Sequence, residues 1–210
     1  MLIAGVDEVG RGALAGPVVA AAVILDNDID GLNDSKKLTE KKRNVLFKII
    51  NDHALSIAVG IKWNDYIDDM NIKVASEHAM IDAINNLSHQ PDKVLVDGFP
   101  LDIPIKNEGV IRGDQKIRSI MAASIIAKVT RDEIMRSFHY IYPMYGFDKN
   151  KGYGTKQHCN ALKEYSYIYI FKKNIYYKMI RYIANHLAFK KNMKYTTLPK
   201  TSIKVSRRPP

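Results

Sequence analysis

The sequence predicts an α/β fold in which a mixed β-sheet is flanked by helices. Runs of Val, Ile and Leu at Leu2–Val6, Val18–Leu25 and Leu55–Val59 have the length and composition of buried strands. After these runs, segments with apolar residues at helical spacing alternate with a further short apolar run. Three early strands followed by such an alternation are typical of a sheet that is covered by helices.

Three helices and a fourth strand complete this predicted body. The first helix is expected from Thr39 to Asp52, with Thr39 as its N-cap residue. Two further helices are expected at Ala75–Leu87 and Gln115–His139, where apolar residues recur every three or four positions. Between them, Val94–Gly98 is predicted to form a short buried strand that carries a carboxylate at its end.

Composition and length exclude several classes of protein. The 210 residues are 46% hydrophobic and 26% charged, which is ordinary for a globular protein and argues against a disordered chain. The longest nearly apolar run, Ala13–Leu25, is shorter than the ~18 residues of a membrane helix. The single Cys159 permits no intrachain disulfide, and two carboxylates near the N-terminus interrupt any signal-peptide core. We therefore expect a cytoplasmic protein that has no membrane span.

Positive charge is concentrated in the last quarter of the chain. Residues 1–162 hold 20 basic and 21 acidic side chains, whereas residues 163–210 hold 12 basic and one acidic side chain, so −1 and +11 give the net charge of +10. We predict a folded domain at residues 1–162, a basic amphipathic helical segment at 163–191 and a flexible basic tail at 192–210. The charge favours a polyanion partner. A solvated helix on the body and a membrane-surface helix remain alternatives.

Four carboxylates are candidates for one site. Asp7 and Glu8 end the first predicted strand, Asp97 ends the fourth, and Asp132 lies on the longest predicted helix. Ligands of α/β sheets bind at the carboxyl ends of the strands, so these groups can meet at one edge of the sheet. A cluster of carboxylates needs a cation among its members, and oxygen ligands select Mg²⁺ or Mn²⁺. Such a cluster suits a two-metal site for phosphoryl transfer.

The same carboxylates also have simpler interpretations. Ser124, Lys128 and Asp132 share one helix face, where Asp132 can pair with Lys128 without any ion. Asp97 can belong to a plain turn. The pair at the end of the first strand is adjacent in sequence, and successive strand side chains point to opposite faces. Both can serve one site only if the strand ends or bends there, which Gly10 allows.

Two glycine-containing segments are candidates for nucleic-acid contacts. Gly10, Arg11 and Gly12 follow the first strand, where backbone amides and a guanidinium can approach a phosphate or sugar, although a tight turn is the alternative. This segment is not a dinucleotide-binding fingerprint, because Pro17 leads into an apolar β-like run instead of a helix. Tyr153 stands between glycines near basic residues and can stack on a base or sugar, or pack on the body.

Five motifs together resemble the ribonuclease HII family, and they occur in the family's order within residues 1–162. They are Val6-Asp7-Glu8-Val9-Gly10-Arg11-Gly12, Asp34-Ser35-Lys36-Lys37-Leu38, Val96-Asp97-Gly98, Ala122-Ala123-Ser124-Ile125-Ile126-Ala127-Lys128-Val129-Thr130-Arg131-Asp132 and Gly152-Tyr153-Gly154-Thr155. Each motif is modest alone, but the combination is highly specific. The resemblance implies a ribonuclease H-like fold.

The resemblance also implies an activity and a set of site residues. It implies an endonuclease that cuts RNA in RNA–DNA hybrids and cuts 5′ of single ribonucleotides embedded in duplex DNA, as ribonucleotide excision repair requires. Two-metal-ion hydrolysis with Mg²⁺ or Mn²⁺ would leave 5′-phosphate and 3′-hydroxyl ends. The implied metal-binding catalytic residues are Asp7, Glu8, Asp97 and Asp132. The implied nucleic-acid contacts are Gly10, Arg11 and Gly12 at the 2′-OH, Tyr153 at the following deoxyribose, and Lys37, Ser124 and Lys128 on the phosphate side.

The chain departs from the family pattern after its last motif. Family members usually continue into a His-Arg-x-Ser-Phe-like stretch, whereas this chain reads Phe-Lys-Lys-Asn-Ile at 171–175. We find no sliding-clamp-binding motif and expect a monomer. Two alternatives remain at this stage. One is a hybrid-binding protein without catalysis, and the other is a ribonuclease HIII-like enzyme restricted to longer hybrids, although that family carries an extra N-terminal domain.

Overall fold

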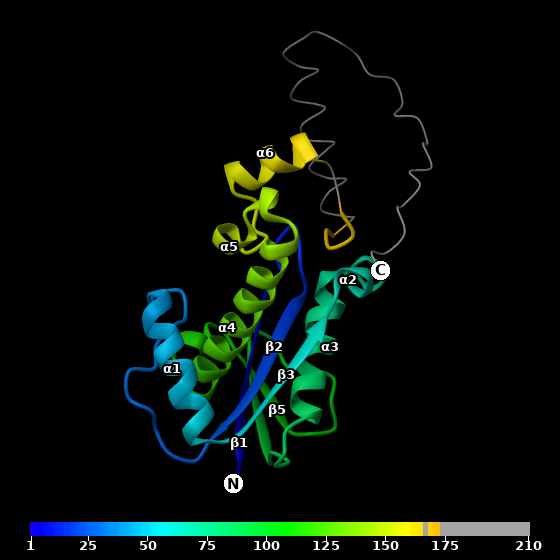
Figure 1. The fold of residues 1–210 in the computed structure, drawn as a ribbon. Coiled ribbons are helices and arrows are strands. Elements are labelled where there is room, and N and C mark those ends of the chain that lie inside the picture. Colours follow the sequence, from blue (N-terminus) through cyan, green and yellow to red (C-terminus); the bar gives the residue numbers. More distant parts are fainter. Residues whose placement is uncertain (166–167, 173–210) are drawn as a thin grey trace. The chain divides into compact units, whose positions relative to one another are not determined.

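A five-stranded mixed sheet forms the centre of the computed structural model, which describes residues 1–165 and 168–172 (Figure 1). The strands are β1 (Ile3–Val9), β2 (Val18–Leu25), β3 (Ala54–Lys62), β4 (Lys93–Asp97) and β5 (Asn107–Val110). Their order is β3-β2-β1-β4-β5, with β1 antiparallel to β2 and parallel to β4. The predicted α/β class, mixed sheet and four strands are confirmed. The fifth strand, β5, was not predicted, because its sequence, Asn-Glu-Gly-Val, contains no apolar run.

Helices cover both faces of this sheet (Figure 1). The helices are α1 (Glu40–His53), α2 (Asn64–Met70), α3 (Ile72–Asn85), α4 (Arg118–Ile141), α5 (Phe147–Asn150) and α6 (Lys156–Tyr165), with 3₁₀ turns η1 (Gly113–Gln115) and η2 (Pro143–Tyr145). α2 and α3 share one apolar core with the sheet, and α1 and α4 share another. The three predicted helices are present, and Thr39 caps α1 by accepting the Lys42 N–H at 3.3 Å.

Successive side chains of β1 point alternately toward α3 and toward α4. Ala4 and Val6 are buried in the core on the α3 side. Gly5 faces the other way, where a Cβ atom would lie 2.2 Å from the carbonyl carbon of Ser119 at the start of α4. Only glycine allows α4 to lie this close to β1. Asp7, two residues further along, lies on the same α4 side of the sheet.

The compact unit that contains the sheet runs from Met1 to Lys173. Ile170, Phe171 and Lys172 are buried within it, so the fold continues beyond the boundary that charge suggested at residue 162. The charge count could not detect this, because the added residues are held by packing. The helical segment predicted at 163–191 and the tail predicted at 192–210 otherwise lie outside the described residues. Among the described helices, none combines the length and the apolar character that a membrane crossing requires.

Candidate active site

Two of the predicted carboxylates stand side by side at the ends of parallel strands. Val6 of β1 pairs with Val96 of β4, so the next residues, Asp7 and Asp97, occupy equivalent positions on neighbouring strands. Their side chains leave the sheet on the same face, toward α4 and η1, because both lie one residue beyond a valine of the opposite core. The strand register therefore brings together two groups that are 90 positions apart in sequence.

Asp7 is buried between β1 and α4. It accepts hydrogen bonds from the hydroxyl of Ser124 and from the Glu8 N–H, the latter at 2.7 Å. The Ser124 hydroxyl also bonds the Ser35 hydroxyl at 2.9 Å, which ties the segment before α1 to this site. Burial, with the charges of Glu8 and Asp97, raises the pKa of Asp7 well above its ordinary value, and the two hydrogen bonds oppose this shift only in part.

Glu8 lies on the opposite side of β1 from Asp7 but belongs to the same electrostatic group. At Glu8, β1 still pairs with β2, but its parallel pairing with β4 ends at Val6, so Glu8 lies past the last residue of β4. The carboxylate accepts a hydrogen bond from Arg11 Nη1 at 3.1 Å. Burial raises the pKa of Glu8, Arg11 opposes the shift, and Asp97 adds to it. The two adjacent carboxylates thus leave opposite sides of β1, yet the charge of Glu8 still acts on Asp7.

Asp97 is held by the turn that follows β5. Its Oδ1 accepts the Gly113 N–H at 2.7 Å. Burial raises the pKa of Asp97, the Gly113 bond lowers it, and the neighbouring carboxylate of Asp114 raises it again. Asp114 is itself buried and pairs with Lys36 at 3.5 Å. The sequence analysis did not identify Asp114, which lies in the 3₁₀ turn η1 directly after Gly113.

The segment before α1 supplies a cation to these carboxylates. Burial works against the charged form of Lys36, but Asp114, Asp7 and Asp34 outweigh burial and raise its pKa. Lys37, which the family resemblance favoured, is exposed to solvent, and so is Lys36. The Asp34-Ser35-Lys36 stretch reaches the site through the Ser35 hydroxyl, which bonds Ser124, and through the ion pair of Lys36 with Asp114.

Asp132 is buried on the face of α4 that sequence analysis identified. Lys128 Nζ donates to Asp132 Oδ1 at 2.7 Å, so the predicted pairing of these two side chains is present. The pair is not on a solvated face, since Asp132 is only 4% exposed. Burial lowers the pKa of Lys128, against the opposing influence of Asp132. Lys128 Nζ also lies 5.8 Å from the ring centre of half-buried Tyr153.

Tyr153 is fixed by its own segment as well as by α4. The guanidinium carbon of Arg131 lies 5.3 Å from its ring centre. Its carbonyl oxygen bonds the Nδ1 of buried His158 at 2.9 Å and accepts the Thr155 N–H at 2.8 Å. Burial lowers the pKa of His158, which favours the neutral ring in this contact. The structure therefore places Tyr153 beside Lys128 and Arg131, in the middle of α4.

The glycine loop, Gly10–Gly16, is anchored from inside by a buried arginine. Arg131 Nε donates to Pro17 O at 2.9 Å, Nη1 to Lys151 O at 2.8 Å and Nη2 to Ala15 O at 3.0 Å. Gly10 has φ +102°, and Gly12 faces open space. Sequence analysis missed this role of Arg131. Its spacing of four residues from buried Ala127 and Met135 was the available signal.

The donor chemistry of the site fits a hard divalent cation. The groups that converge on the strand ends are carboxylates, and burial and mutual repulsion raise the pKa of three of them. Within residues 1–165 and 168–172, however, no three His, Cys, Asp or Glu side chains are already arranged to hold one ion. Asp132 is engaged by Lys128 instead. The carboxylates have the right character for ion binding, and they would have to move closer together to hold one ion.

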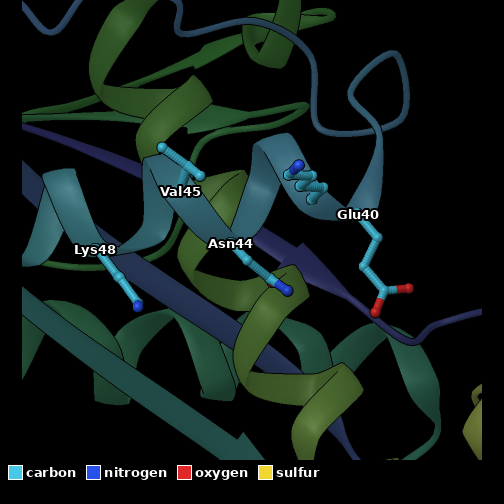
Figure 2. A pocket seen from close by; sticks show the side chains of 5 residues that line it. Glu40, Asn44, Val45 and Lys48 are labelled. Carbon is cyan, nitrogen blue, oxygen red and sulfur yellow. The ribbon is translucent and has the colours of Figure 1, made fainter.

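The hollow on α1 is a separate feature (Figure 2). It is lined by Glu40, Lys41, Asn44, Val45 and Lys48, which all belong to this one helix. None of the predicted site residues lines it. Glu40 also pairs with Arg136 of α4, which links the two helices on this face of the sheet. The hollow therefore carries no part of the candidate chemistry.

Comparison with known proteins decides the family. The family model described as ribonuclease HII matches residues 4–199. The chain belongs to the ribonuclease HII family. Ribonuclease HII of Acetivibrio thermocellus is 55% identical over 167 residues, which cover 78% of this chain and 65% of that protein. This chain therefore matches slightly less than two thirds of the length of that relative.

Solved structures agree with the ribonuclease HII assignment. The crystal structure of ribonuclease H2 from Pyrococcus horikoshii has a TM-score of 0.76 and 28% sequence identity, and the match covers 91% of this chain and all of that one. The structure of Bst-RNase HIII in complex with Mn²⁺ has a TM-score of 0.60 and 19% identity, covering 79% of this chain and 63% of that chain. The second match supports the fold alone.

Proposed function

We propose that this ribonuclease HII family member is an endoribonuclease. It hydrolyses the RNA strand of RNA–DNA hybrids and cuts duplex DNA on the 5′ side of single embedded ribonucleotides, leaving 5′-phosphate and 3′-hydroxyl ends. The observation that carries this proposal is the pairing of Asp7 and Asp97 at the ends of parallel strands, where Glu8 shares their electrostatic field. Buried, mutually repelling carboxylates at this edge of a sheet are a costly arrangement unless they serve a cation.

Four residues would hold the divalent ions, which we propose to be a pair of Mg²⁺ or Mn²⁺ ions. They are Asp7, Glu8, Asp97 and Asp132. When bound, the ions would activate a water molecule and neutralise charge on the leaving oxygen. Manganese is named in the structure of the neighbour Bst-RNase HIII, which supports a divalent requirement here. Without an ion, Lys128 neutralises the charge of Asp132 through their ion pair. When an ion binds Asp132, Lys128 would be free to approach a substrate phosphate.

Recognition of the ribonucleotide is assigned to the glycine loop and Tyr153. The 2′-hydroxyl is the group that distinguishes RNA from DNA, and backbone groups of Gly10, Arg11 and Gly12 stand beside Glu8 without bulky side chains on the glycines. Tyr153 offers an aromatic surface beside Lys128 for the adjacent deoxyribose. Lys36, Lys37 and Ser124 then remain for the phosphate side, where contacts set the register without reading sequence.

The non-catalytic alternative is the less favourable one. A protein that only bound hybrids would gain nothing from burying Asp7 beside Asp97, because carboxylates repel phosphates. The ribonuclease HIII alternative is disfavoured by the match of the ribonuclease HII model over residues 4–199. A cytoplasmic location, a role in ribonucleotide excision repair and a monomeric state stay part of this proposal.

Cleavage of three labelled duplexes tests the proposal. One contains a single ribonucleotide, one is a continuous RNA–DNA hybrid, and one is all DNA, each with Mg²⁺, Mn²⁺ or EDTA. We expect cuts in the first two that stop in EDTA and no cut in the third. Cutting of the continuous hybrid alone would favour the HIII-like alternative, and binding without any cut would favour the non-catalytic one.

A substitution at Asp97 tests the site itself. Asp97→Asn keeps the shape of the side chain and removes a charged ligand, so we expect cleavage to fall by about 10³-fold or more while hybrid binding is retained. Asp102→Asn changes an exposed carboxylate on the loop after β4 and is the matched control. Near-normal turnover of Asp97→Asn would contradict the four-carboxylate assignment.

A further inference from the structure

The last described segment, Ile168–Lys172, lies along the glycine loop. The Gly16 N–H donates to Ile170 O at 2.9 Å, and the Lys172 N–H donates to Leu14 O at 3.0 Å. These bonds lie on either side of an isolated antiparallel β-bridge between Ala15 and Phe171. The stretch in which this chain departs from the family pattern thus forms part of the support for the glycine loop.

The side chain of Lys172 enters this support from within. It is fully buried, and its Nζ donates to the carbonyl oxygen of Gly10 at 2.6 Å. The same oxygen accepts the Ala13 N–H at 3.3 Å. Arg131, which lies nearby, binds other carbonyls of the loop and its neighbours. The two buried cations therefore divide the inward-facing carbonyls between them, and Lys172 takes the one closest in sequence to Glu8.

The position of the Gly10 carbonyl fixes the direction of the next amide. A trans peptide is planar, and its C=O and N–H point in opposite directions. With the Gly10 oxygen directed at Lys172, the N–H of Arg11 points away from Lys172. The φ of +102° at Gly10 permits this orientation, and a Cβ there would lie 2.3 Å from Arg131 Nε and 2.6 Å from Pro17 O. The hydrogen bonds from Lys172 and Ala13 to the Gly10 carbonyl hold the peptide in this orientation.

A buried ammonium is an unfavourable way to fill this space. Burial and the charge of Arg131 on α4 lower the pKa of Lys172 to about 7, and the carboxylate of Asp68 on α2 opposes the shift. A methionine of similar length would fill the same volume without desolvating a charge. The presence of lysine here therefore calls for an explanation beyond packing.

We propose that Lys172 is a positioning residue for ribonucleotide recognition, holding the Gly10 carbonyl so that the Arg11 N–H faces the substrate sugar. This inference rests on the proposed function, because it assigns the glycine loop to the 2′-hydroxyl. Lys172 does not touch the substrate itself. It acts through a single peptide plane, two residues after Glu8.

Binding measured in EDTA tests the inference without turnover. The readout is the ratio of the Kd for an all-DNA duplex to the Kd for the same duplex with one ribonucleotide. We expect Lys172→Met to lower this ratio about tenfold, which corresponds to roughly one hydrogen bond. Lys172→Arg keeps a buried donor and should restore most of the ratio. Lys48→Met, on the hollow of α1, is the matched control and should leave the ratio unchanged.

A pH series on folded protein covers the case in which Lys172→Met does not fold. The charge of Lys172 is lost as pH rises through about 7, so the wild-type ratio should decline between about pH 6 and pH 9. The Lys172→Arg ratio should stay flat, because arginine remains charged. Equal profiles for both proteins, or a Lys172→Met ratio equal to that of the wild type, would overturn the inference. A wild-type protein that binds both duplexes equally would instead defeat the proposed role of the glycine loop.

Discussion

The ionisation of Asp7 couples the stability of the fold to the site. Burial and the charges of Glu8 and Asp97 raise its pKa in the folded protein. A carboxyl group whose folded-state pKa lies above its unfolded-state value stabilises the fold in acid, and this contribution is lost as pH rises through the folded-state pKa. The ion-free protein is therefore expected to hold Asp7 at a cost at neutral pH, which a bound cation would relieve.

Asp7→Asn should make the ion-free protein more stable. The amide keeps a hydrogen-bond acceptor for Ser124 and removes the charge, so we expect the Tm in EDTA at about pH 8 to rise by roughly 3 °C, the effect of ~1 kcal/mol in a domain of this size. The gain should shrink as the pH falls and the wild-type carboxyl group becomes protonated. Asp102→Asn removes an exposed carboxylate outside the site and is the matched control. A lower Tm at pH 8 would show that the charge of Asp7 is not costly.

Tyr153 should matter most where RNA meets DNA. Its ring lies beside Lys128 and Arg131, so it offers a packed aromatic surface to one sugar. We expect Tyr153→Ala to lower kcat/KM about tenfold on a duplex with a single ribonucleotide, the effect of one lost stacking contact, and to affect a continuous hybrid less. Tyr153→Phe keeps the ring and should retain most activity on both. Equal losses on both substrates would argue against a junction role.

The predictability of the site differs from residue to residue. Asp7, Glu8 and Asp97 could be proposed from sequence because they end apolar strands, and parallel pairing brings such ends together. Asp114 and Lys172 could not, since their neighbours come from distant segments and no local pattern marks them. Such contacts depend on tertiary packing, which leaves no periodic pattern in a single sequence.

At the scale of elements, α4 lies close against β1 at Gly5. α4 carries Ser124, Lys128 and Asp132, so its distance from the sheet determines how these side chains meet Asp7. Gly5 sets that distance, because any larger residue would contact the backbone of Ser119. One glycine in the sheet therefore controls the geometry of a site on two elements.

Gly5→Ala should disturb both stability and activity. The added Cβ would lie 2.2 Å from a backbone atom that cannot move aside alone, so we expect a loss of about 2–4 kcal/mol in the free energy of unfolding and reduced cleavage. Denaturant unfolding measures the first and the single-ribonucleotide duplex the second. Gly12→Ala is the matched control for stability, because its Cβ would meet nothing within 4 Å. Similar free energies of unfolding for the two variants would contradict this reading of Gly5.

Most elements could be predicted from hydrophobic periodicity. Helix α6 (Lys156–Tyr165) was not predicted, and the other exceptions share a cause. α1, α3 and α4 are long and amphipathic, and β1 to β4 contain apolar runs, so their patterns are visible in sequence. β5, α2 and α5 are short and mostly polar, and their conformation depends on what they pack against. The C-terminal boundary of the compact unit could not be predicted for the same reason, because Lys172 is a polar residue that packing buries.

At the scale of the whole molecule, the net positive charge lies outside the compact unit that contains the sheet. Residues 1–173 hold 23 basic and 22 acidic side chains, a net charge of +1, while residues 174–210 hold nine basic and no acidic ones. The unit that contains the candidate site is thus almost neutral. Long-range attraction of a polyanion is expected to come from residues 174–210.

Truncation after Lys173 should separate affinity from chemistry. It removes nine positive charges but keeps Lys172 and its contact with Gly10, which truncation after residue 162 would destroy. We expect the slope of log Kd against log salt concentration to become shallower, because fewer counterions are released from the duplex. The cleavage rate at saturating substrate should change little, since the carboxylates remain in place. An unchanged salt slope would show that residues 174–210 do not contact the duplex. A lost kcat with normal folding would show instead that they act in the site itself.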